Sequence, residues 1–333
     1  MSKARGLADL GNVYDDGALS NRNLLINSAM QVSQRGDFSS AATFTSGQYW
    51  LDRWIFDTNN ANSLVSQVGV DVTELSSKTK AARVEAGTTG SSYLGIRQKL
   101  EFPENYAGKT YTFSAYVRSN NVNARLTGFF IGPNQIIASD AHTGDGSWQR
   151  LSVTFTFSTT AASAAYFDGF IASTGIGPVP ISAGDYMEIT GVQLEVGDTA
   201  TPFEHRSYSD ELQRCQRYTY IISGAGYTPA TSSAYARYVM FGTGPTTTKW
   251  ITPFPTTMRA VPSLITNNFT SSTVQIYSYT DDASKTLSSV SLDEGSINHQ
   301  QVTFTISGSG LADTITWRWN NSPAAYIGFD AEL

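Results

Sequence analysis

The residue types that most often perform catalysis are few in this chain and scattered along it. The three histidines, His142, His205 and His299, lie far apart and form none of the short spacings typical of a metal site. The only cysteine, Cys215, has no partner for an intramolecular disulfide. The sequence also lacks the GxSxG, Walker and GxGxxG motifs. No catalytic residue is therefore predicted, and the chain is not expected to be an enzyme.

Cleavage of a glycan would require two carboxylates that face each other across a cleft. The late acidic pairs are Asp281–Asp282 and Asp293–Glu294. Adjacent residues of a strand point to opposite faces, so each pair is predicted to mark a solvated loop. A glycan-cleaving activity is therefore kept only as a minor alternative.

Three carboxylates carry the hard oxygen donors that calcium prefers, namely Asp185, Glu188 and Glu195. Their spacing along the chain does not define a site. No metal-binding residue and no cofactor is predicted.

A ligand-binding role is favoured by aromatic side chains in a part of the chain with few charges. Between Thr219 and Thr280 the only charged residues are Arg237, Lys249 and Arg259. Sugars stack their C–H faces on Tyr and Trp rings, which also offer polar groups for hydrogen bonds. The alternative is that these rings are core or oligomer-interface residues. The predicted glycan-binding residues are Tyr227, Tyr235, Tyr238, Trp250, Tyr277 and Tyr279.

The composition excludes several classes of protein. With 40% hydrophobic and 12% aromatic residues, the 333-residue chain can bury a core and is not expected to be disordered. A net charge of −6, without any run of Lys and Arg, disfavours nucleic-acid binding. No stretch is apolar for long enough to span a membrane, and residues 1–10 lack the apolar core of a signal peptide.

Strand patterns fill most of the chain. Apolar and hydroxyl-bearing residues alternate over residues 109–118, which predicts a half-buried strand with Tyr111 and Phe113 pointing inward and Thr112 outward. Residues 149–157 repeat this alternation. Further strands are predicted at residues 93–102, 124–131, 164–172, 186–196, 218–222, 273–279, 301–307 and 314–319.

Three regions follow from these patterns. Residues 1–23 show no sustained period and are predicted to be an extended arm that docks on another protein. Residues 24–208 are predicted to form a jelly-roll β-sandwich, because many short strands follow one another without helices. Ser209 and the acidic residues after it predict a short helix over residues 209–217, with Ser209 as its cap. Residues 209–333 are then predicted to form a second β-sandwich. The fold class is all-β.

Two segments resemble a known family. They are residues 21–36 (NRNLLINSAMQVSQRG) with residues 49–56 (YWLDRWIF), and residues 192–217 (VQLEVGDTATPFEHRSYSDELQRCQR). Both are similar to tail-fibre and virion structural proteins of phages of aquatic bacteria, which contain a jelly roll like that of carbohydrate-binding modules. The opening SKARGLADLG and the MRAVPSL segment at residues 258–264 also resemble these proteins.

The resemblance implies a phage tail fibre. Such a protein is a homotrimer, attaches to tail or baseplate proteins through residues 1–23, and contacts host surface polysaccharide through its C-terminal domain. It is located in the virion and is made in the host cytoplasm without a signal peptide. The alternatives are a connector, baseplate or capsid-decorating protein without host binding, and a glycan-cleaving tailspike.

The motif residues themselves are interpreted as structural. Leu24 and Ile26 are predicted to share one face of a first strand. Trp54 is predicted to be a core residue. Asp52 with Arg53 is expected to form a pair or to hold backbone groups. Pro202 is predicted to end a strand, Glu204 with Arg206 to clamp the end of the jelly roll, and Cys215 to be a packed thiol.

Overall fold

The computed structural model describes residues 21–332, except 76–78, 173–176, 224–237, 271, 273, 279–282, 309–314 and 320–325. The chain divides into two compact units, residues 1–212 and 213–333. The fold is all-β, as predicted from the alternating patterns. Most of the predicted arm lies outside the described residues. In the described part of the chain, no helix has the length and apolarity that a membrane span requires.

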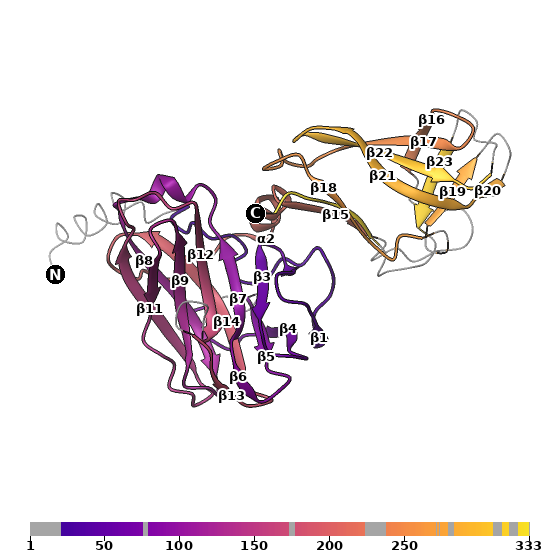
Figure 1. The fold of residues 1–333 in the computed structure, drawn as a ribbon. Helices are drawn as coiled ribbons and strands as arrows, with labels where there is room; N and C mark the ends of the chain where they lie inside the picture. The colour runs from indigo at the N-terminus through magenta and orange to yellow at the C-terminus, as the bar shows by residue number, and fades with distance from the viewer. Residues whose placement is uncertain are drawn as a thin grey trace. The chain divides into compact units, whose positions relative to one another are not determined.

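The first unit is a sandwich of two six-stranded sheets, and all their strand pairings are antiparallel (Figure 1). The first sheet has the order β1 (Ala42–Thr43), β4 (Leu64–Gly69), β5 (Lys80–Glu85), β14 (Tyr186–Val196), β8 (Thr110–Ser119) and β11 (Trp148–Thr156). The second sheet has the order β10 (Gln135–Ala138), β9 (Ala124–Ile131), β12 (Ala164–Ile171), β7 (Leu94–Lys99), β3 (Trp54–Thr58) and β2 (Tyr49–Leu51). A small sheet pairs β13 (Val179–Ile181) with β6 (Gly90–Ser92), and a 3₁₀ helix covers Pro103–Tyr106.

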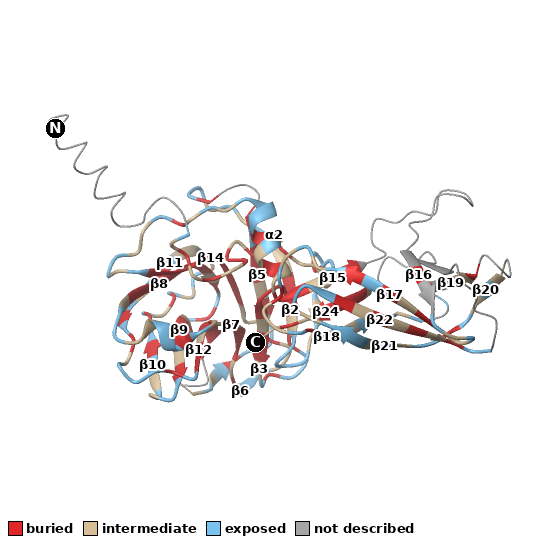
Figure 2. Cartoon of the chain, turned by 90° about the horizontal axis from the view of Figure 1, so that it is seen from above, coloured by how far each residue is buried: buried red, intermediate tan, exposed pale blue. Residues whose placement is uncertain are grey.

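The core of this unit lies between the two sheets and is largely aromatic. Phe113 on β8 and Phe167 on β12 meet across the sandwich with ring centroids 5.1 Å apart in an edge-to-face arrangement. Trp54 is fully buried, as predicted, and its indole Nε1 donates a hydrogen bond to the carbonyl oxygen of Asn27 (3.0 Å). Figure 2 shows buried residues along most strands of this unit.

Strand β8 corrects one prediction. Its inward side chains, including Tyr111 and Phe113, are buried as predicted, but the outward-facing Thr112 and Ser114 are buried as well. Thr112 Oγ1 donates a hydrogen bond to the carbonyl oxygen of Gly197 (3.0 Å), so the segment after β14 covers this part of the sheet. The half-buried strand is therefore β11, which alternates between partly or fully buried and exposed residues over most of its length.

The NLLIN segment is not a strand. Residues 21–30 form a loop in which Leu25 is buried while Leu24 and Ile26 are partly exposed. Asn27 and Met30 have positive φ values of 56° and 52°, which a strand cannot accommodate. Asn27 holds the loop closed, because its side-chain amide donates to the carbonyl oxygens of Val32 (2.8 Å) and Asp52 (2.9 Å).

The predicted helix is present as α2 (Tyr208–Gln216), and the division between the two units falls within it. Its cap is Ser207 rather than Ser209, since the backbone N–H of Asp210 donates to Ser207 Oγ (3.1 Å). Asp210 and Glu211 lie in the first turn and Arg214 in the last, which suits the helix dipole.

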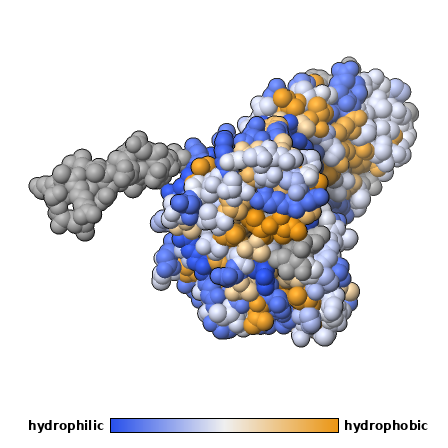
Figure 3. All heavy atoms as spheres, turned by 60° about the vertical axis from the view of Figure 1, so that its left-hand side comes forward, coloured by the Kyte–Doolittle hydropathy of each residue, from blue (hydrophilic) through white to orange (hydrophobic). Residues whose placement is uncertain are grey.

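The second unit has its own core and two antiparallel sheets. A three-stranded sheet has the order β15 (Thr219–Ser223), β24 (Tyr326–Asp330) and β18 (Ser263–Asn267). A seven-stranded sheet has the order β20 (Ala283–Lys285), β19 (Val274–Ser278), β23 (Ile315–Trp319), β16 (Tyr238–Gly242), β17 (Thr247–Pro253), β22 (His299–Ile306) and β21 (Leu287–Gly295). On the side of the molecule drawn in Figure 3, hydrophobic residues lie in patches among hydrophilic ones.

Candidate functional site

The candidate site is the outer face of the second sheet of the first unit. On β12, Ala165, Phe167 and Ile171 belong to the core, so Tyr166, Asp168 and Phe170 lie on the opposite face. A larger set shares this face by the same alternation and the strand register. It comprises Ile55 and Asp57 on β3, Gly95, Arg97 and Lys99 on β7, and Arg125, Thr127 and Phe129 on β9.

Arg97 lies at the centre of this face between two carboxylates. Its Nη2 is 2.5 Å from Asp57 Oδ2, and its Nε is 3.4 Å from Asp168 Oδ1. The guanidinium carbon is 5.3 Å from the ring centroids of both Tyr166 and Phe170. Charge pairing and two ring contacts therefore fix the orientation of Arg97.

Asp168 is almost fully buried at 2% exposure. Burial raises its pKa to about 7, while the Arg97 charge opposes the rise and the Asp57 charge adds to it. Thr127 Oγ1 donates a long hydrogen bond of 3.4 Å to Asp168 Oδ2. Asp168 Oδ1 makes no hydrogen bond with any described residue. A buried carboxyl oxygen that makes no hydrogen bond can accept one from a ligand.

Aromatic rings flank this polar centre. Tyr93, Phe129 and Tyr166 are each partly exposed, whereas Phe170 is fully buried. The ring of Tyr93 lies 6.1 Å from that of Phe170. Gly95 makes room for Phe170, because a Cβ atom at Gly95 would lie 2.6 Å from Phe170 Cγ. Partly exposed rings beside hydrogen-bonding groups are what sugar recognition requires.

The residues predicted to bind a glycan are in the second unit, and the structure describes few of them. Tyr227, Tyr235 and Tyr279 lie outside the described residues, and only the backbone of Tyr238 is described, in β16. Trp250 on β17 is 6% exposed and packs in the core, so its ring face is not open to a ligand. Tyr277 on β19 is partly exposed.

The histidines contact other residues of the protein: the ring of His205 lies edge-to-face 5.0 Å from that of Phe203, and His299 Nδ1 is 3.1 Å from Ser296 Oγ. The backbone N–H of Gly144 donates to His142 Nδ1 (2.8 Å), so His142 Nε2 carries the proton and donates to the carbonyl oxygen of Ser147 (2.9 Å). His142 thus closes a turn. Cys215 is fully buried, as predicted for a packed thiol.

The acidic residues considered from the sequence also have partners within the protein where the structure describes them. Asp293 is on β21 rather than in a loop, and Lys249 Nζ, 2.5 Å away, lowers its pKa. Asp281 and Asp282 lie outside the described residues. Asp185 accepts a hydrogen bond from the Asn121 amide (2.7 Å). No group of three metal-ligating side chains occurs among the residues that the structure describes.

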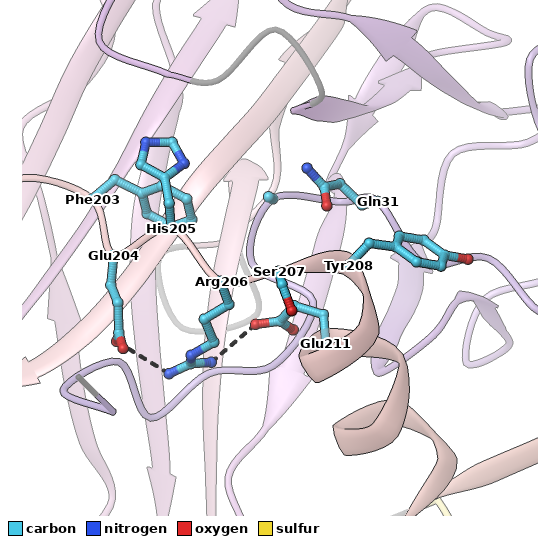
Figure 4. A pocket seen from close by; sticks show the side chains of 9 residues that line it. Gln31, Phe203, Glu204, His205, Arg206, Ser207, Tyr208 and Glu211 are labelled. Carbon is cyan, nitrogen blue, oxygen red and sulfur yellow. Dashed lines mark hydrogen bonds and ion pairs between the residues drawn. The ribbon is translucent and has the colours of Figure 1, made fainter.

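The TPFEHR segment forms the predicted clamp, which Figure 4 shows beside a pocket of about 250 Å³. Arg206 lies between Glu204 (3.2 Å) and Glu211 (3.1 Å) and donates to the carbonyl oxygen of Leu25 (3.0 Å). Glu204 accepts from the backbone N–H of Asn23 (2.7 Å). Strand β14 covers residues 186–196, as predicted, but Pro202 lies outside any strand and does not end one. The pocket is lined by Ala29, Gln31, Phe203, Glu204, His205, Arg206, Ser207, Tyr208 and Glu211.

Asp52 and Arg53 hold backbone groups, as predicted. Asp52 accepts a hydrogen bond from the backbone N–H of Gln34 (3.0 Å), and Arg53 donates one to the carbonyl oxygen of Lys99 (3.0 Å). The family motifs therefore contribute to the scaffold of the first unit.

The part of the chain that contains the outer face of the second sheet matches a known family model. Residues 35–171 match the family model described as carbohydrate binding domain. The matched segment contains every residue assigned above to the outer face of the second sheet. No curated protein matches the chain.

Several solved structures are similar to part of the chain at low sequence identity. The enzymatically active domain of tailspike protein 4 of bacteriophage CBA120 is 11% identical with a TM-score of 0.38, covering 53% of this chain and 22% of the tailspike chain. The module TmCBM61, solved with β-1,4-galactotriose, is 13% identical with a TM-score of 0.33, covering 53% of this chain and all of the module. A sugar-binding protein candidate from Bacteroides thetaiotaomicron is 11% identical with a TM-score of 0.32, covering the same shares. The chain thus spans about a fifth of the tailspike chain.

Sequence reasoning missed the outer face, although one signal was present. The strand predicted over residues 164–172 carries a single charged residue, Asp168, among apolar and aromatic ones. A charge inside such a strand requires a partner on a neighbouring strand. Arg97, in the strand predicted over residues 93–102, is that partner.

Proposed function

We propose that the first unit binds a glycan through the outer face of the second sheet. The observation that carries the proposal is the group of partly exposed rings, Tyr93, Phe129 and Tyr166, around the fixed guanidinium of Arg97. Rings supply planes for the apolar faces of sugars, and the Asp57–Arg97–Asp168 cluster supplies oriented hydrogen-bonding groups. The match of residues 35–171 to a carbohydrate binding domain supports this assignment.

The test uses two tyrosines in matched settings. Tyr166 on the second sheet and Tyr186 on the first are both partly exposed, and each has an arginine over its ring, Arg97 at 5.3 Å and Arg83 at 4.0 Å. The full chain is screened by calorimetry against a panel of polysaccharides. Tyr166→Ala is expected to weaken binding by about 2 kcal/mol, roughly thirtyfold, while Tyr186→Ala leaves it unchanged. Equal effects of the two substitutions would contradict the proposal.

At the level of the organism, we propose that the protein is a structural component of a phage tail fibre. The support is the resemblance of residues 21–56 and 192–217 to such proteins. In this proposal it is a homotrimer in the virion, residues 1–23 attach it to other tail proteins, and it contacts host polysaccharide. The connector without host binding is the alternative. Saturable binding of the labelled full chain to host cells, blocked by their extracted polysaccharide, is the expected result; a folded chain that does not bind would favour the connector.

A contribution of the second unit to host contact remains a separate proposal. Tyr277 is the predicted residue there whose side chain is described as partly exposed. If the second unit carries the host contact, Tyr277→Ala in the full chain lowers cell binding and Tyr166→Ala does not. The reverse result would assign the contact to the first unit.

A further inference from the structure

Arg125 on β9 has an unusual environment for an arginine of this protein. Its side chain is partly buried, and its Nε is buried without a hydrogen-bond partner. Among the described residues of the first unit, every other arginine makes a hydrogen bond or an ion pair, and Arg125 makes neither. The others are Arg22, Arg35, Arg53, Arg83, Arg97, Arg118, Arg150 and Arg206.

A partly buried cation without a counter-charge has lost hydration that nothing in the described protein replaces. An anion that approaches Arg125 would restore that interaction, and a guanidinium pairs with a carboxylate through two parallel hydrogen bonds. The free guanidinium is therefore a group for which binding a carboxylate is favourable.

The charges on the outer face of the second sheet also favour an anionic ligand. Arg97, Lys99 and Arg125 are cations, whereas Asp57 and Asp168 are the acids on the same strands. Arg97 is already paired with Asp57. The chain as a whole has a net charge of −6, so an excess of cations on this face is a local feature.

The position of Arg125 fits a ligand that lies across the rings. Arg125 is the cross-strand neighbour of Phe170, whose ring contacts that of Tyr93. Phe129 follows Arg125 by four residues on the same face, which is about 13 Å along a strand. An oligosaccharide stacked on the partly exposed rings of Tyr93 and Phe129 would place its substituents within reach of the guanidinium.

We propose that the glycan is acidic and that Arg125 binds one of its carboxylates. This inference rests on the proposed glycan-binding function and adds the chemical class of the ligand. Arg97 orients the sugar over the partly exposed ring of Tyr166, and Arg125 provides the charge that selects a uronic acid or a similar sugar over a neutral one.

The experiment compares acidic polysaccharides with neutral versions of the same polymers. The full chain is tested against polygalacturonate, alginate and hyaluronate, each beside its carboxyl-reduced form, and against neutral galactan, xylan and β-glucan. The variants are Arg125→Gln and, as a control with the same change of charge, Lys109→Gln, because Lys109 is exposed and lies outside the candidate face. Arg125→Lys tests whether charge alone suffices.

The unmodified chain is expected to bind at least one acidic polymer roughly tenfold more tightly than its reduced form. Arg125→Gln removes that preference and keeps the residual binding to the reduced form, Arg125→Lys keeps part of it, and Lys109→Gln changes nothing. Added salt weakens the acidic binding selectively.

Equal binding of acidic and reduced polymers, or a preference that survives in Arg125→Gln, would overturn the inference and leave the proposed glycan-binding function intact. A folded chain that binds no polymer of the panel would overturn both. Thermal unfolding of each variant establishes that it is folded.

Discussion

The outer faces of the two sheets in the first unit both carry arginines, carboxylates and aromatic rings. They differ in how completely the charged side chains are paired with one another. On the first sheet, Glu188 is buried and receives hydrogen bonds from Arg83 (2.8 Å) and Arg118 (2.6 Å). The two guanidinium groups also lie over aromatic rings, that of Tyr186 at 4.0 Å and that of Trp148 at 4.9 Å. Arg83 also pairs with Glu85 (2.8 Å) and Arg118 with Asp71 (3.5 Å), so both cations of this face have carboxylate partners.

On the second sheet the pairing is incomplete. Arg97 is shared between two carboxylates, Asp168 Oδ1 has no hydrogen-bond partner among the described residues, and Arg125 has no counter-charge there. A network in which every charge is paired contributes to folding. Buried polar groups without hydrogen-bond partners cost stability and are typical of sites where a ligand binds them. The first face is therefore interpreted as structural and the second as the binding face.

The largest effect should come from breaking the saturated network. Glu188→Gln leaves Arg83 and Arg118 without their shared charge and is expected to lower the free energy of unfolding by about 3 kcal/mol. Urea unfolding at pH 7 measures it. A loss below about 0.5 kcal/mol, the range of an exposed pair, would show that this face is not a structural network.

The negative charge of Asp168, unlike that of Glu188, is expected to lower the stability of the folded protein. Its folded-state pKa of about 7 is above its ordinary value of 3.8, so the folded protein binds the proton more tightly than the unfolded chain does. Its contribution to stability is complete below about pH 4 and is lost as the pH rises through 7.

Asp168→Asn resembles the protonated carboxyl group and is expected to remove this loss. At pH 8.5 the variant should be more stable than the unmodified protein by at least about 2 kcal/mol, and at pH 3.5, below the unfolded pKa, the difference should nearly vanish. Urea unfolding at the two pH values tests this. A variant that is destabilised most at pH 8.5 would mean that the Arg97 ion pair outweighs desolvation.

The smallest effects should come from two buried threonines on opposite faces. Thr112 Oγ1 makes two hydrogen bonds, with Thr154 Oγ1 (2.9 Å) and with the carbonyl oxygen of Gly197 (3.0 Å). Among the described residues, the side chain of Thr127 makes a single hydrogen bond, the 3.4 Å contact with Asp168. Thr112→Val should cost about 1 kcal/mol and Thr127→Val about half of that. The urea midpoints of the two variants measure these losses. A larger loss for Thr127→Val than for Thr112→Val would contradict the distinction between a structural first face and a binding second face.

Much of the fold could be predicted from the sequence, because alternation and turn residues are local signals. The strand predicted over residues 124–131 matches β9 fully, and α2 was displaced by one residue. The error at NLLIN arose because hydrogen bonds of Asn27 to Val32 and Asp52 favour a loop that apolar spacing does not reveal.

The candidate site was harder to predict for a physical reason. Alternation shows which residues of one strand share a face, but it does not show which strands are neighbours. Arg97 and Asp168 meet only because β7 pairs with β12, which are separated by β8 to β11 in the chain. The aromatic residues chosen in the second unit were selected by composition, and Trp250 shows that a ring in a charge-poor segment can simply be core.

The most direct test of the binding face is a crystal structure of the full chain soaked with the tightest-binding oligosaccharide from the polysaccharide panel. We predict density for the sugar over Tyr93 and Tyr166, with hydrogen bonds to the Arg97–Asp168 pair. Sugar bound on the first sheet beside Tyr186 and Trp148, or only on the second unit, would contradict the account.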